Sequence, residues 1–488
     1  MAEDHIAQDR KELDRGVLVN FLGYALKLAN PALLILATRR YGAESWGVFV
    51  TAQATLLVLV RVFVMGLDKG VLWWVPRQSP GAARHGVLRL GAILATGSVI
   101  AGSALAGFGV DLACRLGLSC PDAAQLRLLS LSLAPILLTE FFLHATMGRR
   151  RMEGQVLIRE TLAPLLFTGG AVAAWHAGFA RWGLGASYLV ANLVAALAAF
   201  ALFLRLFPER DAGEPVPLAP MVRYSLPLWA NEFANALLLR IDTLAVATFC
   251  DARAVGVYGI VLQFSNAIRS IRRSYDPIVL AISSRISVAR DPQRLRANFS
   301  RATNLVISTQ TPVFVALACV LQWVLPLYGP EFGSGESAII VVCAFWILAA
   351  PLQMCSLVVS GYGRSGLMLL NTGLVLALEI PLLRLFVPGM GLEGASLAVG
   401  SSYLIVSLVQ AFQMRRVTGA WNWDRSVFAT LAWTVFAFVA SGIVLSMLGG
   451  WNTPVARIAA LAVFLLVSLA GYLTNRSRLR RMAIAPVP

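Results

Sequence analysis

The sequence predicts an all-α polytopic membrane protein, and three observations lead to that fold class. Of the 488 residues, 58% are hydrophobic and only 14% are charged, whereas soluble proteins carry about 25% charged residues. Apolar runs long enough to cross a bilayer recur along most of the chain. Arginines concentrate in every second connection between these runs, which is the pattern of cytoplasmic loops.

Fourteen apolar runs are predicted to span the membrane, at about 1.5 Å of rise per residue. They lie at 16–38, 46–66, 86–109, 125–147, 157–178, 183–207, 222–249, 255–280, 302–328, 336–361, 366–388, 391–414, 426–449 and 455–475. The connections on one side carry few cations, namely Arg39, Arg40, Arg115, Arg127, Arg181 and Arg253. Both termini are therefore predicted to be cytoplasmic, with the first run acting as an uncleaved anchor.

An internal repeat predicts two similar halves. Gly47-Val48-Phe49 opens the second span and Gly256-Val257-Tyr258 opens the eighth, an offset of 256 − 47 = 209 residues. Gly185-Ala186-Ser187 and Gly394-Ala395-Ser396 open the sixth and twelfth spans with the same offset, 394 − 185 = 209. Since each half has six spans, the two lobes form a parallel pseudo-repeat, followed by two C-terminal helices. The predicted divisions are an N-terminal lobe at 1–207, a cytoplasmic linker at 208–221, a C-terminal lobe at 222–416, and the last two spans with a cytoplasmic tail at 417–488.

The later part of the eighth span is polar on one face. At about 100° per residue, six of its side chains share an arc of roughly 100°. They are Ser265, Asn266, Arg269, Arg272, Arg273 and Asp276. A membrane helix with one cationic face is expected to turn that face toward water, protein or an anion.

Cations inside the predicted spans are the candidate substrate-binding residues, because each costs roughly 2.5–3.5 kcal/mol at the bilayer centre unless it meets a partner or a wet cavity. They are Lys27, Arg61, Arg240, Arg269, Arg272 and Arg273. Under the repeat, Arg61 corresponds to position 61 + 209 = 270, beside Arg269. Arg272 and Arg273 are predicted at the cytoplasmic mouth, where Asp276 can pair with them. Arginine binds phosphate bidentately, so these residues suit an anionic head group. The structural alternative stays open, with Arg240 or Arg269 neutralised by Asp242, Glu232, Glu140 or Glu379.

Acidic and histidine side chains inside the spans are candidates for coupling to an ion, H⁺ or Na⁺. Glu140 and His144 lie one turn apart in the fourth span, and Glu232 and Asp242 lie in the seventh. A hydrogen-bonded structural pair is the alternative reading of Glu140 and His144. No metal-ligand spacing and no Gly-x-x-x-x-Gly-Lys-[Ser/Thr] motif occurs, so neither a metal, a cofactor nor ATPase activity is predicted.

Two further features bear on partners and compartment. Most of the net charge of +16 is accounted for by loop arginines, so nucleic acid is not predicted as a partner. Cys114 and Cys120 share a predicted outer loop, where a disulfide and two free thiols both stay open.

Several motifs resemble the oligosaccharide (O-antigen) flippases of the multidrug/oligosaccharidyl-lipid/polysaccharide exporter (MOP) superfamily. In the first half they are Arg40-Tyr41-Gly42-Ala43-Glu44-Ser45-Trp46-Gly47-Val48-Phe49 and Gly66-Leu67-Asp68-Lys69-Gly70. In the second half they are Arg240-Ile241-Asp242, Ala254-Val255-Gly256-Val257-Tyr258 and Gly391-Leu392-Glu393-Gly394-Ala395-Ser396. The resemblance covers about residues 16–420.

This resemblance implies an alternating-access flippase rather than an enzyme. Its substrate would be an undecaprenyl-diphosphate-linked oligosaccharide, moved across the bacterial cytoplasmic (inner) membrane for surface polysaccharide biosynthesis, with membrane lipids and other polysaccharide-assembly proteins as partners. The related lipid II flippases keep cavity cations on spans 1, 2 and 8, where this chain has Lys27, Arg61 and Arg269. It departs from them by having a single lysine in span 1 in place of several arginines.

Three alternatives remain at this stage. A lipid II flippase is one, and a multidrug antiporter of the same superfamily is another, although an antiporter for organic cations would require net acidic cavity residues. A membrane glycan polymerase or ligase would require a catalytic centre in a large outer loop, and no such loop is predicted.

Overall fold

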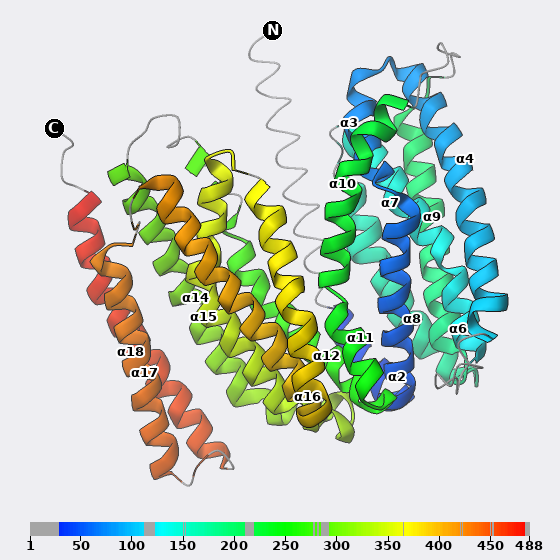
Figure 1. The fold of residues 1–488 in the computed structure, drawn as a ribbon. Helices are drawn as coiled ribbons and strands as arrows, with labels where there is room; N and C mark the ends of the chain where they lie inside the picture. Colours follow the sequence, from blue (N-terminus) through cyan, green and yellow to red (C-terminus); the bar gives the residue numbers. More distant parts are fainter. Residues whose placement is uncertain are drawn as a thin grey trace, which may run out of the picture. The chain divides into compact units, whose positions relative to one another are not determined.

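The structure is a computed structural model. It describes residues 29–111, 123–149, 151, 153–209, 219–276, 279–280, 283–284, 292–364, 366–419, 421, 423–448, 450 and 453–483. Lys27, Cys114 and Cys120 lie outside these ranges, so the predictions made for them stay predictions. Within these ranges the regular secondary structure is helical, as the sequence predicts (Figure 1).

The chain divides into two compact units. Unit 1 comprises Met1–Ala247, Asp251–Gly256 and Leu327–Gly329, and unit 2 comprises the remainder. The seventh predicted span thus packs mostly with unit 1, while residues 210–218 of the linker predicted at 208–221 lie outside the described residues. The domain limits drawn from the repeat stay a prediction.

The helices of unit 1 form a bundle. They are α2 (Ala29–Val64), α3 (Leu67–Trp74), η1 (Val75–Arg77), α4 (Pro80–Ala104), η2 (Leu105–Gly109), α6 (Ala123–Leu131), α7 (Leu133–Gly148), η3 (Gln155–Leu162), α8 (Ala163–His176), α9 (Gly183–Leu206), α10 (Ala219–Leu238) and α11 (Ile241–Phe249). Helix α7 is the most enclosed: it packs against α3, α4 and α9, and most of its side chains are buried. A polar side chain on α7 is therefore held by protein rather than by lipid.

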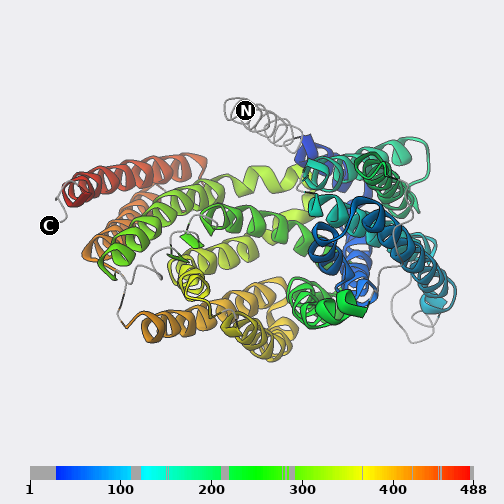
Figure 2. The same cartoon turned by 90° about the horizontal axis from the view of Figure 1, so that it is seen from above.

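Unit 2 contains the remaining helices. They are α12 (Ala252–Arg273, beginning in unit 1), α14 (Pro292–Tyr328), η4 (Pro330–Gly335), α15 (Glu336–Gly361), α16 (Gly366–Thr418), α17 (Arg425–Met447) and α18 (Pro454–Ala483). Helices α17 and α18 lie side by side in both views (Figures 1 and 2). They expose large apolar side chains such as Phe428, Val435 and Leu466, which suits contact with lipid.

The predicted spans coincide with helices, and the described residues contain ten helical stretches long and apolar enough to cross a membrane. Helix α16 covers the two spans predicted at 366–388 and 391–414, joined at Gly391 (φ 57°), and α2 covers the described end of the first predicted span and most of the second, joined at Gly42 (φ 76°). Positive φ is readily adopted by glycine because it has no Cβ, so the chain reverses there without a longer loop. The protein is thus a multi-pass helical membrane protein, while the count of fourteen remains a prediction.

The connection after the second predicted span differs from expectation. The sequence assigns Lys69 to a cytoplasmic loop, but the chain makes a tight break at Met65 (φ 48°) and Gly66 (φ 71°) and continues as α3. A Cβ on Gly66 would lie 2.6 Å from the carbonyl oxygen of Ser225, so the break also requires close packing against α10. As a result, Asp68 and Lys69 are turned back toward Arg61 and α7.

Candidate functional site

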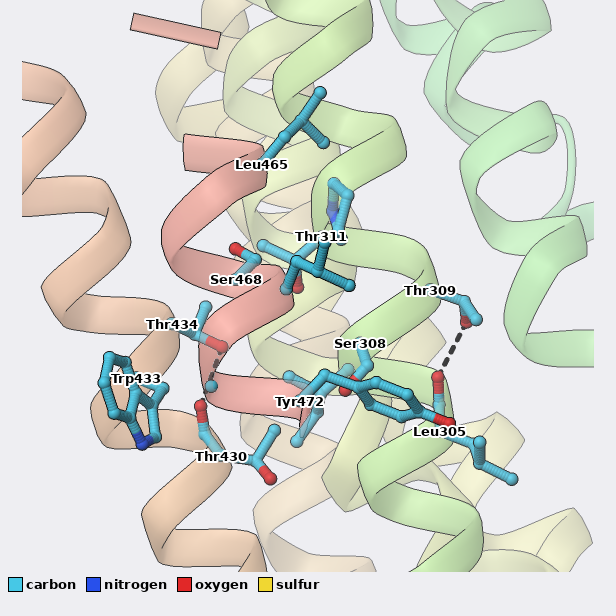
Figure 3. Close-up of a pocket in the computed structure, with 14 residues that line it drawn as sticks. Leu305, Ser308, Thr309, Thr311, Thr430, Trp433, Thr434, Leu465, Ser468 and Tyr472 are labelled. Carbon is cyan, nitrogen blue, oxygen red and sulfur yellow. Dashed lines mark hydrogen bonds between the residues drawn. The ribbon is translucent and has the colours of Figure 1, made fainter. Parts of the chain in front are cut away.

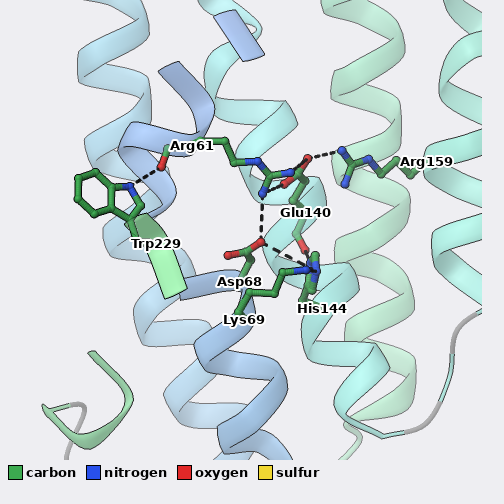
Figure 4. Close-up of polar contacts among 7 residues, drawn as sticks. All are labelled: Arg61, Asp68, Lys69, Glu140, His144, Arg159 and Trp229. Atoms are coloured by element: carbon green, nitrogen blue, oxygen red, sulfur yellow. Dashed lines mark hydrogen bonds and ion pairs between the residues drawn. The ribbon is translucent and has the colours of Figure 1, made fainter. Parts of the chain in front are cut away.

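A buried network of charged side chains occupies unit 1. We call it the unit 1 cluster, and it comprises Arg61, Asp68, Lys69, Glu140, His144 and Arg159 (Figure 4). These residues come from α2, α3, α7 and η3, so the break at Met65–Gly66 and the enclosed position of α7 both contribute to assembling it.

Arg61 is at the centre of the unit 1 cluster. Its guanidinium lies 2.8 Å from Oε2 of Glu140 and donates to Oε1 of Glu140 at 3.2 Å and to Oδ2 of Asp68 at 3.2 Å. Both carboxylates are almost fully buried, while the Arg61 side chain keeps 18% of its surface exposed. Trp229 on α10 donates its indole N–H to the Arg61 carbonyl at 2.8 Å. Arg61 is therefore neutralised by two acidic residues.

A second part of the cluster surrounds His144. Nδ1 of His144 lies 2.7 Å from the Glu140 carbonyl oxygen, and Nε2 lies 3.3 Å from Nζ of Lys69. Because a carbonyl only accepts and an ammonium only donates, this arrangement fits a neutral histidine with its proton on Nδ1. Oδ2 of Asp68 lies 3.9 Å from Nε2, close enough to become a partner if that nitrogen gains a proton.

Arg159 adds a further cation to Glu140, with which it forms an ion pair. Glu140 thus lies between Arg61 and Arg159, and it is not available to neutralise Arg240 or Arg269. The sequence alone did not reveal Asp68 as the partner of Arg61. The signal that could have found it is the Gly66-Leu67-Asp68-Lys69-Gly70 motif, since a glycine two residues before a charged pair indicates a break in the helix that can redirect the pair.

A contrasting group lies on α12 in unit 2. We call it the unit 2 stripe, and it comprises Ser265, Arg269, Arg272, Arg273 and Asp276. Arg272 donates to Asp276 at 2.8 Å, an i,i+4 pair that the sequence predicts. Arg269 and Arg273 have no carboxylate partner among the residues that the structure describes. The stripe thus has three guanidinium groups and one carboxylate, Asp276 just after the end of α12, which pairs with Arg272 alone.

Arg269 is held by aromatic rings. Its Cζ lies 4.2 Å from the ring centroid of Trp346 on α15 and 5.3 Å from that of Tyr403 on α16. Trp346 also donates its indole N–H to Oγ of Ser265 at 2.7 Å, one turn before Arg269 on α12. Neither aromatic residue was predicted, because an aromatic side chain in an apolar span looks like ordinary core in the sequence.

The other predicted candidates lie in unit 1. Arg240 lies in the break between α10 and α11. Asp242 is buried in the first turn of α11 and accepts hydrogen bonds from the backbone N–H and hydroxyl of Thr243. Glu232 is half-buried on α10. These residues are not part of the unit 1 cluster.

Unit 2 also contains a cavity of about 400 Å³ between α14, α17 and α18 (Figure 3). No residue that lines it is charged. The hydroxyls of Thr309, Thr430 and Thr434 donate to carbonyl oxygens one turn earlier on their own helices, at 2.8–3.0 Å. With these polar groups satisfied internally, the cavity suits an apolar chain better than an ion.

Comparisons with known proteins agree with this architecture. Residues 118–333 match the family model described as polysaccharide biosynthesis protein. No curated protein matches the chain.

Solved structures extend the comparison to most of the chain. An inward-facing multidrug resistance transporter of the MATE family, in the MOP superfamily, superposes with a TM-score of 0.64 at 16% identity, covering 81% of this chain and 98% of that one. The lipid II flippase MurJ in an inward closed conformation gives a TM-score of 0.69 at 13% identity, covering 94% and 99%. This chain has the fold of these two transporters. The fold expected from the sequence resemblance is thereby confirmed.

Proposed function

We propose that this protein is an alternating-access flippase for a polyprenyl-diphosphate-linked oligosaccharide in a bacterial cytoplasmic membrane. The observation that carries the proposal is the unit 2 stripe, where Asp276 pairs with Arg272 and no carboxylate among the described residues pairs with Arg269 or Arg273. An excess of guanidinium on a helix otherwise surrounded by apolar segments suits a phosphate-bearing head group. The family-model match to polysaccharide biosynthesis supports an oligosaccharide as the remainder of that head group.

The two arginines that the repeat relates have different roles in this proposal. Arg269 is the principal diphosphate ligand, with Arg272 and Arg273 in support. The donors of Arg61 are already engaged by Asp68 and Glu140, so a diphosphate would have to compete with two buried carboxylates. Arg61 therefore joins the head-group site only if those ion pairs open during transport. Lys27 and Arg240 remain proposed supporting cations from the sequence.

The uncharged cavity between α14, α17 and α18 supports a lipid-linked substrate. The hydroxyls of Thr309, Thr430 and Thr434 are satisfied within their own helices, Thr311 alone among the lining threonines leaves a buried hydroxyl oxygen without a partner, and neighbouring surfaces of α17 and α18 are apolar. A hydrocarbon chain fits such a site, whereas a free nucleotide sugar does not. We assign it to the polyprenyl part of the substrate.

The unit 1 cluster is the proposed ion-coupling site, with Glu140 and His144 as the predicted members and Asp68 added. In the neutral state Lys69 donates to Nε2 of His144, and after protonation Nε2–H can donate to Asp68 instead. Protonation of His144 on α7 would thus change its Nε2 partner from Lys69 to Asp68, both on α3. Asp242 and Glu232 stay secondary candidates.

Reconstituted vesicles provide the test of the function. Purified protein in liposomes should move a fluorescent polyprenyl-diphosphate disaccharide between leaflets, while Arg269→Gln should reduce the rate at least tenfold without loss of inserted protein. Arg415→Gln, a cytoplasmic arginine stacked on Trp421 at 5.1 Å, is the matched control and should retain the rate. Equal transport by wild type and Arg269→Gln would contradict the diphosphate site. Transport of organic cations in place of the glycolipid would favour a multidrug antiporter, and turnover of the glycan bond would favour a membrane glycan enzyme.

A further inference from the structure

The unit 2 stripe contains two ways of holding a guanidinium. Arg272 donates one N–H to Asp276 at 2.8 Å, an ion pair that neutralises its charge. Arg269 instead lies against the faces of Trp346 and Tyr403. A ring face attracts the cation without accepting its in-plane N–H bonds. The two ring contacts therefore stabilise the charge of Arg269 without giving its N–H donors an oxygen acceptor.

Trp346 contacts two successive turns of the same helix face. Its indole N–H donates to Oγ of Ser265 at 2.7 Å, and its ring lies under Arg269, four residues later. Both Ser265 and Trp346 are buried, with 2% and 3% of their surfaces exposed. Because the hydrogen bond holds the indole against α12, it also holds the ring next to the guanidinium of Arg269.

Tyr403 supports this arrangement from α16. Its ring meets that of Trp346 nearly edge-on, with centroids 4.8 Å apart and planes at 68°. Edge-to-face packing of this kind is favourable by about 0.5–1.5 kcal/mol beyond burial, so Tyr403 limits rotation of the indole. Helices α12, α15 and α16 thus all contribute to the position of one cation.

We propose that Trp346 and Tyr403, fixed through Ser265, are positioning residues that present Arg269 to an oxyanion while leaving its charge uncompensated. The inference rests on the proposed function, because the oxyanion is the diphosphate of the lipid-linked substrate. Preorganisation of this kind increases affinity, since the long arginine side chain loses little freedom on binding. A carboxylate in the place of Trp346 would also hold Arg269, but it would compete with the diphosphate.

Binding of farnesyl diphosphate to the purified full-length protein, measured by calorimetry, tests the proposal, with farnesol as the probe that lacks the diphosphate. Trp346→Leu and Tyr403→Leu should each weaken farnesyl diphosphate binding, the first by about tenfold. Trp346→Phe retains a ring face but cannot donate to Ser265, so it should recover only part of the affinity, to about the level of Ser265→Ala. Binding of farnesol should not change in any of these variants.

A double-mutant cycle separates positioning from a merely structural role. In an Arg269→Lys background, whose compact ammonium gains less from a planar ring, Trp346→Leu should cost far less than in the wild type. An equal cost in both backgrounds would overturn the inference. Trp421→Leu removes the similar stack of Trp421 and Arg415 outside the stripe and should leave binding unchanged.

The outcomes distinguish the positioning role of Trp346 from the proposed diphosphate site at Arg269. Loss of binding in Arg269→Gln together with wild-type affinity in Trp346→Leu would overturn the positioning role and leave the diphosphate site intact. Wild-type affinity in Arg269→Gln would overturn the diphosphate site itself. Should Trp346→Leu fail to fold, Tyr403→Leu and Ser265→Ala provide the same comparison, and wild-type affinity in both would overturn the inference.

Discussion

Gly47 and Gly256 pack against each other in unit 1. A Cβ on Gly47 would lie 1.6 Å from the Ala252 carbonyl oxygen, and a Cβ on Gly256 would lie 1.9 Å from the Ala43 carbonyl oxygen. The contact is reciprocal under the sequence repeat, because 252 − 43 and 256 − 47 are both 209. Equivalent segments that cross this closely have no room for a side chain at either position. The glycines that revealed the repeat are thus required by the contact between its copies.

Alanine at either glycine is expected to destabilise the protein. The added methyl meets backbone rather than a movable side chain, so the helices must separate, at a cost of about 1–3 kcal/mol or more. Gly97→Ala and Gly169→Ala are the matched controls, because a Cβ at either position meets nothing within 4 Å. Those controls should be neutral or slightly stabilising, by up to about 1 kcal/mol. Thermal unfolding in detergent measures the difference, and equal melting temperatures for Gly47→Ala and Gly97→Ala would refute the close contact.

Arg61→Gln should destabilise unit 1 strongly. The substitution leaves Asp68 and part of Glu140 as buried carboxylates without their central cation, and breaking a buried pair in this way costs about 3–5 kcal/mol. The double variant Arg61→Gln/Asp68→Asn should recover part of that loss, because it removes one uncompensated charge.

The control for Arg61 is an exposed ion pair. Arg127 and Asp111 lie 2.8 Å apart with 51% and 54% of their side chains exposed, and Arg127→Gln should change stability by less than about 1 kcal/mol. Thermal unfolding of the purified variants reports both effects. A wild-type melting temperature for Arg61→Gln would mean that the cluster does not depend on this arginine.

Arg457 ties α18 to α15 through Glu336. Their side chains lie 3.2 Å apart and are only 4% and 25% exposed. Arg457→Met should therefore cost about 1–3 kcal/mol, since Glu336 loses a buried charged partner. Glu336→Gln in the same chain should relieve part of the loss, as the partner is then neutral. Limited proteolysis near the start of α18 provides the measurement. Unchanged cleavage in Arg457→Met would show that the ion pair with Glu336 does not hold α18 against α15.

The ends of α7 and α9 are joined by a pair outside the membrane-spanning segments. Arg149 lies 3.2 Å from Glu209, and its Cζ lies 4.2 Å from the Phe207 ring. A hydrogen bond from the backbone N–H of Glu209 itself, followed by one from Arg149, lowers the pKa of Glu209 below its ordinary value. Because the folded pKa is depressed, the stabilisation is present above the unfolded pKa and disappears as the pH falls through the folded value.

Glu209→Gln should therefore reduce the melting temperature slightly and equally between about pH 6 and pH 8. Below the ordinary glutamate range the wild type should converge on the variant, because the carboxylate of Glu209 becomes protonated. Melting curves across this pH range supply the measurement. A difference that grows on acidification would have the wrong sign for this pair.

Local sequence information predicted the positions of the helices well and the interruptions between consecutive helices less well. The span predicted at 336–361 has the same limits as α15, because an apolar run of that length specifies a membrane helix without reference to its neighbours. The prediction of a loop at Lys69 was wrong, since α3 forms only where Gly66 packs against Ser225 on α10. A contact between positions 159 residues apart cannot be read from local hydropathy.

The candidate site shows the same division. Arg61 and Arg269 were identified because a charge in an apolar run is conspicuous and the repeat relates their positions. The partners of these arginines were not identified, because Asp68 lies between two predicted spans and Trp346 resembles an ordinary core residue of an apolar span. Arg61 meets two carboxylates and Arg269 meets two aromatic rings, a difference that the repeat does not predict.

The sequence by itself determined that this chain is a helical membrane protein with a twofold repeat and cations within its spans, since hydropathy, charge bias and a 209-residue offset are properties of the chain alone. Only the tertiary structure decided which of those cations is neutralised. The charge of a buried arginine depends on the groups within a few ångströms of it, and helices distant in sequence supply those groups.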